Sequence, residues 1–325
     1  MPRATEDAAS ADFFLPEFIQ RFLPGRKSLQ SLLDIRFFSR VRRLSLEITL
    51  ALMLNLVRPG ERVGYQKVID RFFSETGLAF SHDQVVKPPD KAAFHRARQK
   101  IPVKVCQLLF AEAVAYAHSL ARQQDKLTWN GFRVYAIDGT KKNLPASDEL
   151  SDFFEAPHQA HFPQMITGVL FDVLAKLPLN YMRAPFNTPE RQMALELLRE
   201  LGPGDLTLLD RGYPGYRMFH AVITQGADFL VRLPKDGLFQ EARDFLARGK
   251  RDGKITVSPP KKLLRANPHE KYPPLTLRIV VVSLPGTAAD AVFITTLLDS
   301  KKYPRRALRN LYHPGLFRKN RWKMT

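Results

Sequence analysis

The chain has 325 residues, 45% of them hydrophobic and 25% charged, which is enough for about two domains with buried cores. Lysine and arginine number 50 against 32 acidic residues, so the formal net charge is +18. A surplus of this size favours a polyanionic partner, most simply nucleic acid. The single cysteine, Cys106, excludes a disulfide scaffold and a cysteine-built metal site, and it indicates a reducing compartment.

The sequence predicts no membrane partner. Its most apolar run, residues 44–57, is interrupted by Glu47 and Asn55 and is shorter than the roughly 20 residues that a spanning helix needs. The first ten residues lack the apolar stretch of a signal peptide. We therefore expect a cytoplasmic protein.

Residues 1–127 carry helical patterns throughout and are expected to form a helical DNA-binding domain. Residues 103–120 form the longest of these helices, with Cys106 expected on its apolar face, in the core. A short basic helix follows Pro88-Pro89-Asp90. Its DNA-binding candidates are Lys91, Arg96, Arg98 and Lys100. These side chains either dock on phosphates or form a solvated helix face, and the sequence leaves both open.

After residue 130 the pattern changes to buried strands alternating with helices. Residues 133–138 and 164–174 are expected strands, and residues 188–201 an expected helix. A strand at 206–210, a helix at 216–224 and a strand at 227–233 form a βαβ unit, whose strands must be parallel. The pattern predicts an α/β fold, with residues 128–237 as the first part of a catalytic core.

The last third of the chain is expected to return to this core. Residues 238–290 read as a β-rich insertion, and residues 291–325 as the last core strand followed by a basic tail. The segment 301–325 contains nine basic residues and no acid. Arg305, Arg306 and Arg309 are its candidate DNA contacts.

Two aspartates are the strongest candidates for chemistry. Asp138 and Asp210 each end an apolar strand, and in an open α/β sheet ligands gather beyond the carboxyl ends of the strands. Two carboxylates held close together repel unless a cation lies between them, and oxygen ligands favour Mg²⁺ or Mn²⁺. Such ions activate water for phosphodiester cleavage. The simpler alternative is that each aspartate caps a turn.

Residues 135–140 (YAIDGT) and 208–214 (LLDRGYP) resemble the first two acidic motifs of bacterial DDE transposases of the insertion-sequence-four family. The resemblance extends to residues 93–101 and to Thr295-Thr296-Leu297-Leu298-Asp299, and it covers about residues 25–313.

The resemblance implies a ribonuclease-H-like mixed-sheet core interrupted by a β-rich insertion, behind a helical amino-terminal domain. It implies Mg²⁺-dependent cleavage and transfer of double-stranded DNA at terminal inverted repeats, in a bacterial, nucleoid-associated protein, and it is compatible with a homodimer on DNA. Asp138 and Asp210 carry over as catalytic metal-binding carboxylates. Three basic residues beside them are expected to contact DNA: Lys141, Lys142 and Arg211.

The family's third carboxylate does not carry over. It belongs to a Tyr-x2-Arg-x3-Glu-x6-Lys pattern in which Tyr312 fits the tyrosine, whereas Gly315 stands at the arginine position and Lys319 at the glutamate position. Pro314 with Gly315 is expected to break the helix there. We expect a frameshift or truncation before this motif, with Asp299 and Glu241 as weak replacements.

Two functions stay open on the sequence alone. The first is a transposase whose strand transfer is impaired by the loss of the third carboxylate. The second is a non-catalytic DNA-binding protein, derived from a transposase, that acts as a competitor or inhibitor.

Overall fold

The computed structural model describes residues 31–34, 36–38, 43–56, 64–77, 80–81, 84–85, 87–122, 127–157, 160–234, 238–283 and 290–316. The chain divides into two compact units, Met1–Ala117 and His118–Lys323. None of the described helices combines the length and the apolarity needed to cross a membrane.

The described residues of the first unit are largely helical. Its helices are α3 (Leu46–Asn55), α4 (Tyr65–Glu75), α5 (Lys91–Arg98) and the first part of α6 (Val103–Arg122). The Ser45 hydroxyl caps α3 and the Asp90 carboxylate caps α5. One antiparallel pair, β1 (Phe80–Ser81) with β2 (Gln84–Val85), was not predicted, because two-residue strands leave no alternating pattern. Cys106 is exposed, so its predicted place in the core is wrong.

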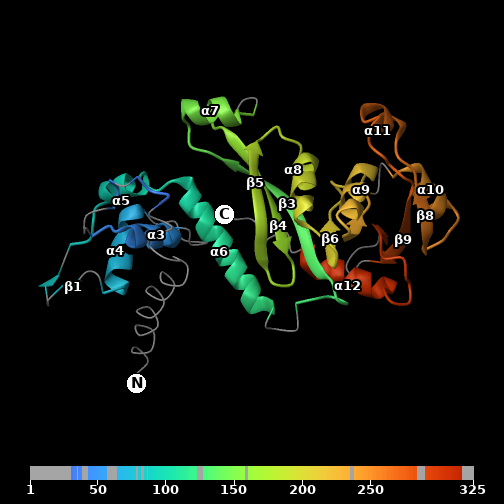
Figure 1. The fold of residues 1–325 in the computed structure, drawn as a ribbon, viewed down its shortest axis with the longest axis horizontal. Helices are drawn as coiled ribbons and strands as arrows, with labels where there is room; N and C mark the ends of the chain where they lie inside the picture. Colours follow the sequence, from blue (N-terminus) through green and yellow to red (C-terminus); the bar gives the residue numbers. More distant parts are fainter. Residues whose placement is uncertain are drawn as a thin grey trace, which may run out of the picture. The chain divides into compact units, whose positions relative to one another are not determined.

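The second unit is built on one eight-stranded mixed sheet (Figure 1). Its strands are β3 (Arg133–Asn143), β4 (Gln164–Asp172), β5 (Leu177–Pro185), β6 (Asp205–Leu209), β7 (Asp228–Arg232), β8 (Asp252–Val257), β9 (Leu275–Ser283) and β10 (Asp290–Thr295). Their order across the sheet is β5-β4-β3-β6-β7-β10-β9-β8. The pairs β3·β6 and β6·β7 are parallel, and the other pairs in this sheet are antiparallel.

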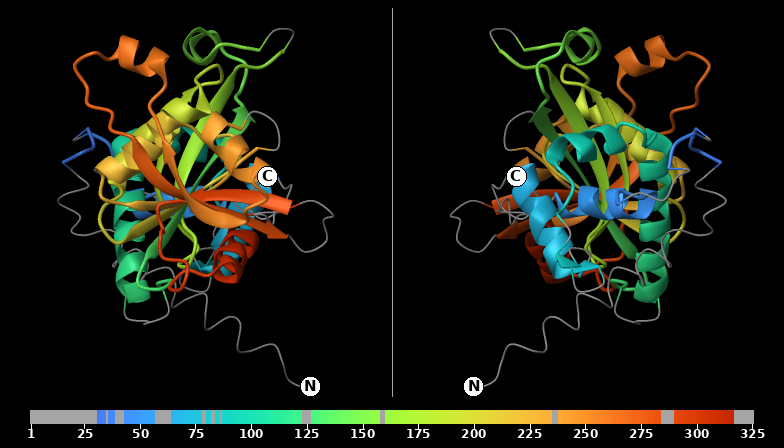
Figure 2. Two further views of the ribbon diagram at one scale, coloured as in Figure 1. Left: turned by 90° about the vertical axis from the view of Figure 1, so that its right-hand side faces the viewer. Right: turned by 90° about the vertical axis from the view of Figure 1, so that its left-hand side faces the viewer.

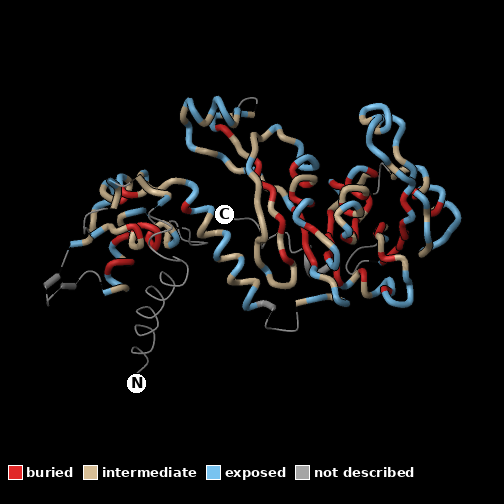
Figure 3. The backbone as a smooth tube through the Cα atoms, in the orientation of Figure 1, coloured by how far each residue is buried: buried red, intermediate tan, exposed pale blue. Residues whose placement is uncertain are grey.

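Helices cover both faces of this sheet, with α12 on the opposite side from α8, α9 and α10 (Figures 1 and 2). The helices are α7 (Asp148–Phe154), α8 (Glu190–Leu197), α9 (Tyr216–Thr224), α10 (Gln240–Ala247), α11 (Lys261–Ala266) and α12 (Arg305–Leu316). Along β3, Tyr135 and Ile137 pack under α8 and α9, whereas Val134 and Ala136 pack on the α12 side. The inner strands β6 and β7 are mostly buried, whereas the edge strand β5 is half-buried (Figure 3).

The predicted α/β class with a mixed sheet is confirmed, but three features differ from expectation. Strands β8 and β9, from the predicted β-rich segment 238–290, extend the central sheet, which the sequence did not indicate. Strand β5 was not predicted. The backbone of α12 continues through Pro314 and Gly315 to Leu316, so the predicted helix break is wrong. Pro314 lies in the last turn, where the missing N–H removes a single helical hydrogen bond.

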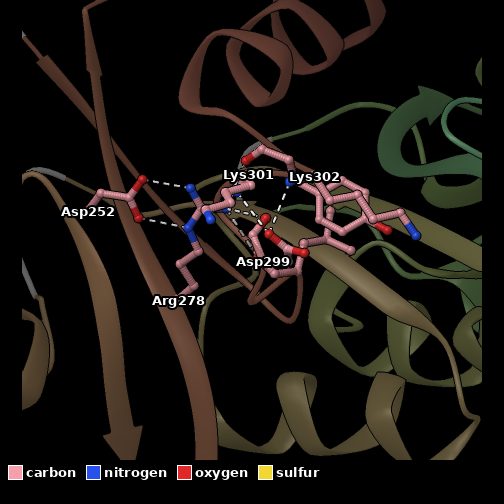
Figure 4. A network of polar contacts seen from close by, with 7 residues as sticks. Asp252, Arg278, Asp299, Lys301 and Lys302 are labelled. Carbon is pink, nitrogen blue, oxygen red and sulfur yellow. Dashed lines mark hydrogen bonds and ion pairs between the residues drawn. The ribbon is translucent and has the colours of Figure 1, made fainter.

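A buried arginine on β9 fixes the approach to α12 (Figure 4). Arg278 is 1% exposed, and its Nε and Nη2 donate to the Asp252 carboxylate at 2.7 and 2.6 Å. Its Nη1 donates to the carbonyl oxygen of Tyr303 at 2.8 Å. Asp299 turns the same loop by accepting from the backbone N–H groups of Lys301 and Lys302. The point where α12 begins is therefore tied to the outer strands of the sheet.

Candidate active site

Asp138 and Asp210 lie at the same level on neighbouring parallel strands. The last pair between β3 and β6 is Ala136 with Leu208, so continuing the register by two residues sets Asp138 opposite Asp210. Ala136 and Leu208 both belong to the α12-side cluster, and side chains alternate along a strand, so both carboxylates extend toward that face. Neighbouring strands are about 4.8 Å apart. The structure thus brings the two predicted aspartates together.

The two carboxylates are held by neighbouring backbone groups. Oδ1 of Asp138 accepts from the N–H of Gly139 at 2.9 Å, and Oδ1 of Asp210 accepts from the N–H of Arg211 at 2.6 Å. Asp210 directly follows β6, as predicted. Asp138 does not end its strand, because pairing with β4 keeps β3 extended as far as Asn143. Asp138 therefore lies on the part of β3 that no longer pairs with β6 but still pairs with β4.

Helix α12 and strand β7 add two residues beside Asp210. Tyr312 is 1% exposed and donates from its hydroxyl to the carbonyl oxygen of Leu209 at 3.1 Å. The pair Leu209 with Val231 ends the β6·β7 ladder, so Arg232 is the neighbour of Asp210 in register. Burial lowers the pKa of Arg232, with the charge of Arg211 in support. Burial also raises the pKa of Tyr312, and the negative charge of Asp210 adds to that shift.

A second pair of residues approaches from the opposite face of the sheet. Glu190 begins α8, and its Oε1 lies 3.2 Å from the position that a Cβ on Gly139 would take. Tyr213 follows β6 and lines a small pocket together with Asp138 and Glu190. The pKa of Tyr213 is raised by burial first and then by the charges of Glu190, Asp138 and Asp210. Carboxylates therefore lie near Gly139 on both faces of the sheet, Glu190 on one and Asp138 on the other.

Sequence reasoning missed Arg232, Glu190 and Tyr213. A signal for Arg232 was present, since residues 227–233 were predicted to run parallel to residues 206–210, and the alternation sets Arg232 level with Asp210. Glu190 looked like an ordinary acid at a helix amino terminus. No pattern in the sequence indicates that α8 starts against Gly139.

Two carboxylates suit a cation that completes its shell with water and substrate. Mg²⁺ is usually held in proteins by one or two carboxylates together with substrate phosphates, and Asp138 and Asp210 supply that donor set. Among the described residues no three Asp, Glu, His or Cys side chains gather closely enough to hold a metal. Among the described residues the site can hold an ion through two carboxylates, and the remaining ligands of that ion would be water and substrate.

The two expected replacements for the third carboxylate lie elsewhere. Glu241 is on α10 and accepts from the N–H of Ser258 at 3.2 Å. Asp299 follows β10, which runs antiparallel to β7, so it leaves the sheet at the opposite end from Asp210. Both proposals of a stand-in are therefore wrong. Lys319, at the family's glutamate position, lies outside the described residues.

The predicted DNA contacts fall into three groups. Arg96 on α5 and Lys100, two residues after that helix, line a cavity of about 1000 Å³ together with Arg36, Arg43 and two phenylalanines. Lys91 begins α5, and Arg98 contacts His95. Near the aspartates, Lys141 and Lys142 are on β3, and Arg211 is exposed beside Asp210. On α12 the group is Arg305, Arg306 and Arg309.

Comparison with known proteins finds similarity to transposases. Over 233 residues the chain is 23% identical to the transposase InsG for insertion sequence element IS4 of Escherichia coli (strain K12), which covers 68% of this chain and 49% of InsG. The chain therefore matches about half the length of that curated relative. A piggyBac transposase synaptic complex with hairpin DNA is 12% identical and covers 94% of this chain and 65% of that one. The TM-score of that match is 0.38.

The model of the transposase DDE domain family matches residues 129–314. That range begins just before β3 and ends within α12, so it includes both aspartates and Tyr312. The chain belongs to the transposase DDE domain family.

Proposed function

We propose that the chain binds double-stranded DNA and that Asp138 and Asp210 hold Mg²⁺ or Mn²⁺ at the bond to be cleaved. The observation that carries this proposal is the shared level and shared face of the two carboxylates on parallel strands. When bound, a divalent cation there supplies an activated water and stabilises charge on a phosphodiester oxygen. Family membership supports the same chemistry.

The residues around the aspartates have supporting roles. Tyr312 fixes the backbone at Leu209 and so sets the direction in which Asp210 leaves β6. Arg211 and Arg232 supply positive charge beside Asp210, where a DNA phosphate would approach. Lys141 and Lys142 continue β3 beyond Asp138 and extend this basic surface.

We propose that strand cleavage by this chain is weak. Within the described ranges no third acid joins Asp138 and Asp210, and positional errors at a reacting centre cost on the order of 100-fold in rate. This observation favours a second candidate function, a non-catalytic DNA-binding protein that competes for terminal inverted repeats. Binding to those repeats, dimerisation on DNA and association with the nucleoid belong to the same proposal.

The experiment is a plasmid-nicking assay with Mg²⁺ and Mn²⁺. We expect slow nicking by the unaltered chain and none by Asp138→Asn or Asp210→Asn. Asp152→Asn removes an exposed carboxylate on α7 and is expected to leave nicking unchanged.

Nicking that survives Asp138→Asn rejects the assignment of the site. DNA binding without any metal-dependent nicking rejects the catalytic function and leaves the competitor. Absence of DNA binding rejects both.

A further inference from the structure

A groove lined by arginines lies between α12 and the outer strands of the sheet. Its volume is about 460 Å³, and we call it the arginine groove, after Arg251, Arg305, Arg306 and Arg309. Residues 281–283 at the end of β9 also line it, with Val282 on the α12 side of the sheet. Its four guanidinium groups come from two segments more than 50 residues apart in the chain.

One of these arginines is paired with an acid. Asp290 pairs with Nη2 of Arg251 at 2.8 Å and accepts from the Ser283 hydroxyl at 2.7 Å. Within the described part of the chain, Arg305, Arg306 and Arg309 have no ion pair with an acid. Three unneutralised guanidiniums therefore face the same opening.

The position of these arginines on α12 is itself unfavourable without an anion. Arg305 and Arg306 lie in the first turn, which carries no acidic residue. The amino-terminal end of a helix carries partial positive charge, so cations there are repelled and anions are attracted. A bound phosphate would reduce the repulsion among the arginines and the repulsion between the arginines and the helix amino terminus.

Helix α12, which carries three of the arginines, is anchored to the rest of the unit. Leu308 and Leu311 bury the inner side of α12, and Arg278 holds the carbonyl oxygen of Tyr303 just before the helix begins. The arginines therefore project from a helix that is fixed at its start and along its inner side. Little backbone ordering is left to oppose binding.

The groove opens at the same end of the sheet as the two aspartates. Strand β9 is antiparallel to β10, which is antiparallel to β7, so β9 runs in the direction of β6. Ser283 at the end of β9 and Asp210 after β6 consequently lie at one edge. Three strand spacings, about 14 Å, separate the two strands, and Ser283 lies three residues beyond the level of Asp210. The two residues are therefore about 17 Å apart, which corresponds to about five base pairs along a duplex.

We propose that the arginine groove binds the sugar-phosphate backbone of double-stranded DNA, a few base pairs from the bond held at Asp138 and Asp210. This inference rests on the proposed function and adds to it a second anchoring point. Phosphate contacts of this kind set the register of a duplex without reading its sequence.

The test compares two triple variants of the full chain. Arg305→Gln, Arg306→Gln and Arg309→Gln empty the groove of charge. The matched control is Lys261→Gln, Lys262→Gln and Arg265→Gln on α11, where exposed basic residues have the same spacing after a proline. Binding of a fluorescent duplex is measured over a range of salt concentrations.

Each phosphate contact contributes about 0.9 to the slope of log affinity against log salt, so we expect the groove variant to lose roughly 2–3 and the control less than about 1. Equal slopes for the two triple variants overturn the groove. A parent chain without salt-dependent binding instead overturns the proposed function.

Discussion

The hydroxyl of Tyr312 donates to the carbonyl oxygen of Leu209, 103 residues earlier in the chain. The bond joins α12 to the residue directly before Asp210. The Tyr312 ring also packs against Phe293, with ring centroids 4.6 Å apart. One side chain therefore connects the carboxyl-terminal helix, β10 and the end of β6.

Tyr312→Phe should destabilise the fold while keeping the ring in place. It leaves the Leu209 carbonyl without this donor, and a lost buried hydrogen bond costs about 1 kcal/mol in the free energy of unfolding. Urea unfolding measures the change. Tyr65→Phe, at an exposed position, is the control, and equal stability of the two variants would show that the bond contributes nothing.

Arg278→Met should be more damaging. It removes both bonds to Asp252 and the donor to the Tyr303 carbonyl, at a side chain that is 1% exposed. Breaking a buried ion pair costs about 2–4 kcal/mol when one partner keeps some contact with water. We expect this loss in chemical unfolding, against less than about 0.5 kcal/mol for the exposed control Arg265→Met. A loss as small as the control's contradicts the role of Arg278 in holding the start of α12.

Asp205 should make stability depend on pH in the acid range. Burial raises its pKa above the ordinary value of 3.8, although Gly202 and Arg133 act against that shift. Because the folded pKa is the higher one, the contribution of Asp205 is greatest below pH 3.8 and is lost as the pH rises through the folded pKa.

Asp205→Asn, which keeps an acceptor for the Gly202 N–H, should remove this part of the pH dependence. Unfolding free energies measured from acid to neutral pH test the sign. A steeper decline with rising pH in the variant than in the parent would contradict it.

Two glycine-to-alanine changes should differ in cost. A Cβ at Gly139 would lie 3.1 Å from Cδ of Glu190, an exposed and flexible side chain that can move aside. A Cβ at Gly253 would lie 2.8 Å from Cε2 of Phe245, a buried ring on α10. We expect Gly253→Ala to cost about 1–3 kcal/mol and Gly139→Ala to cost less. The reverse order in thermal unfolding would refute this packing argument.

Adding Glu190→Ala to Gly139→Ala should recover the loss at Gly139, because the close contact disappears. No recovery would mean that Glu190 is not the obstacle.

The βαβ unit of β6, α9 and β7 was predictable, because a helical crossover makes two strands of one sheet parallel. The pairing of β3 with β6, which brings Asp138 to Asp210, did not follow from this rule, because β4, β5 and α8 lie between those strands in the chain. Strand β5 was not predictable from its pattern. It lies at one edge of the sheet, most of its residues are half-buried, and Pro178 and Asn180 obscure the alternation. The positions of β8 and β9 at the outer edge of the sheet were not predictable either, because a short apolar run does not indicate which strand it pairs with.

Some residues of the candidate site were predictable from the sequence and others were not. The aspartates were found because an acid directly after an apolar run is visible in a sequence, although β3 itself continues past Asp138 to Asn143. Glu190, Tyr213 and Arg232 were missed because each becomes a neighbour of the aspartates only through packing or register.

The outermost strand of the sheet is mechanically connected to the candidate active site. Asp252 on the edge strand β8 holds Arg278, Arg278 holds the loop before α12, and α12 holds the backbone next to Asp210 through Tyr312. A rigid helix transmits displacement along its axis with little loss. A disturbance of the far edge of the sheet should therefore reach Asp210 through α12 and need not pass across the intervening strands.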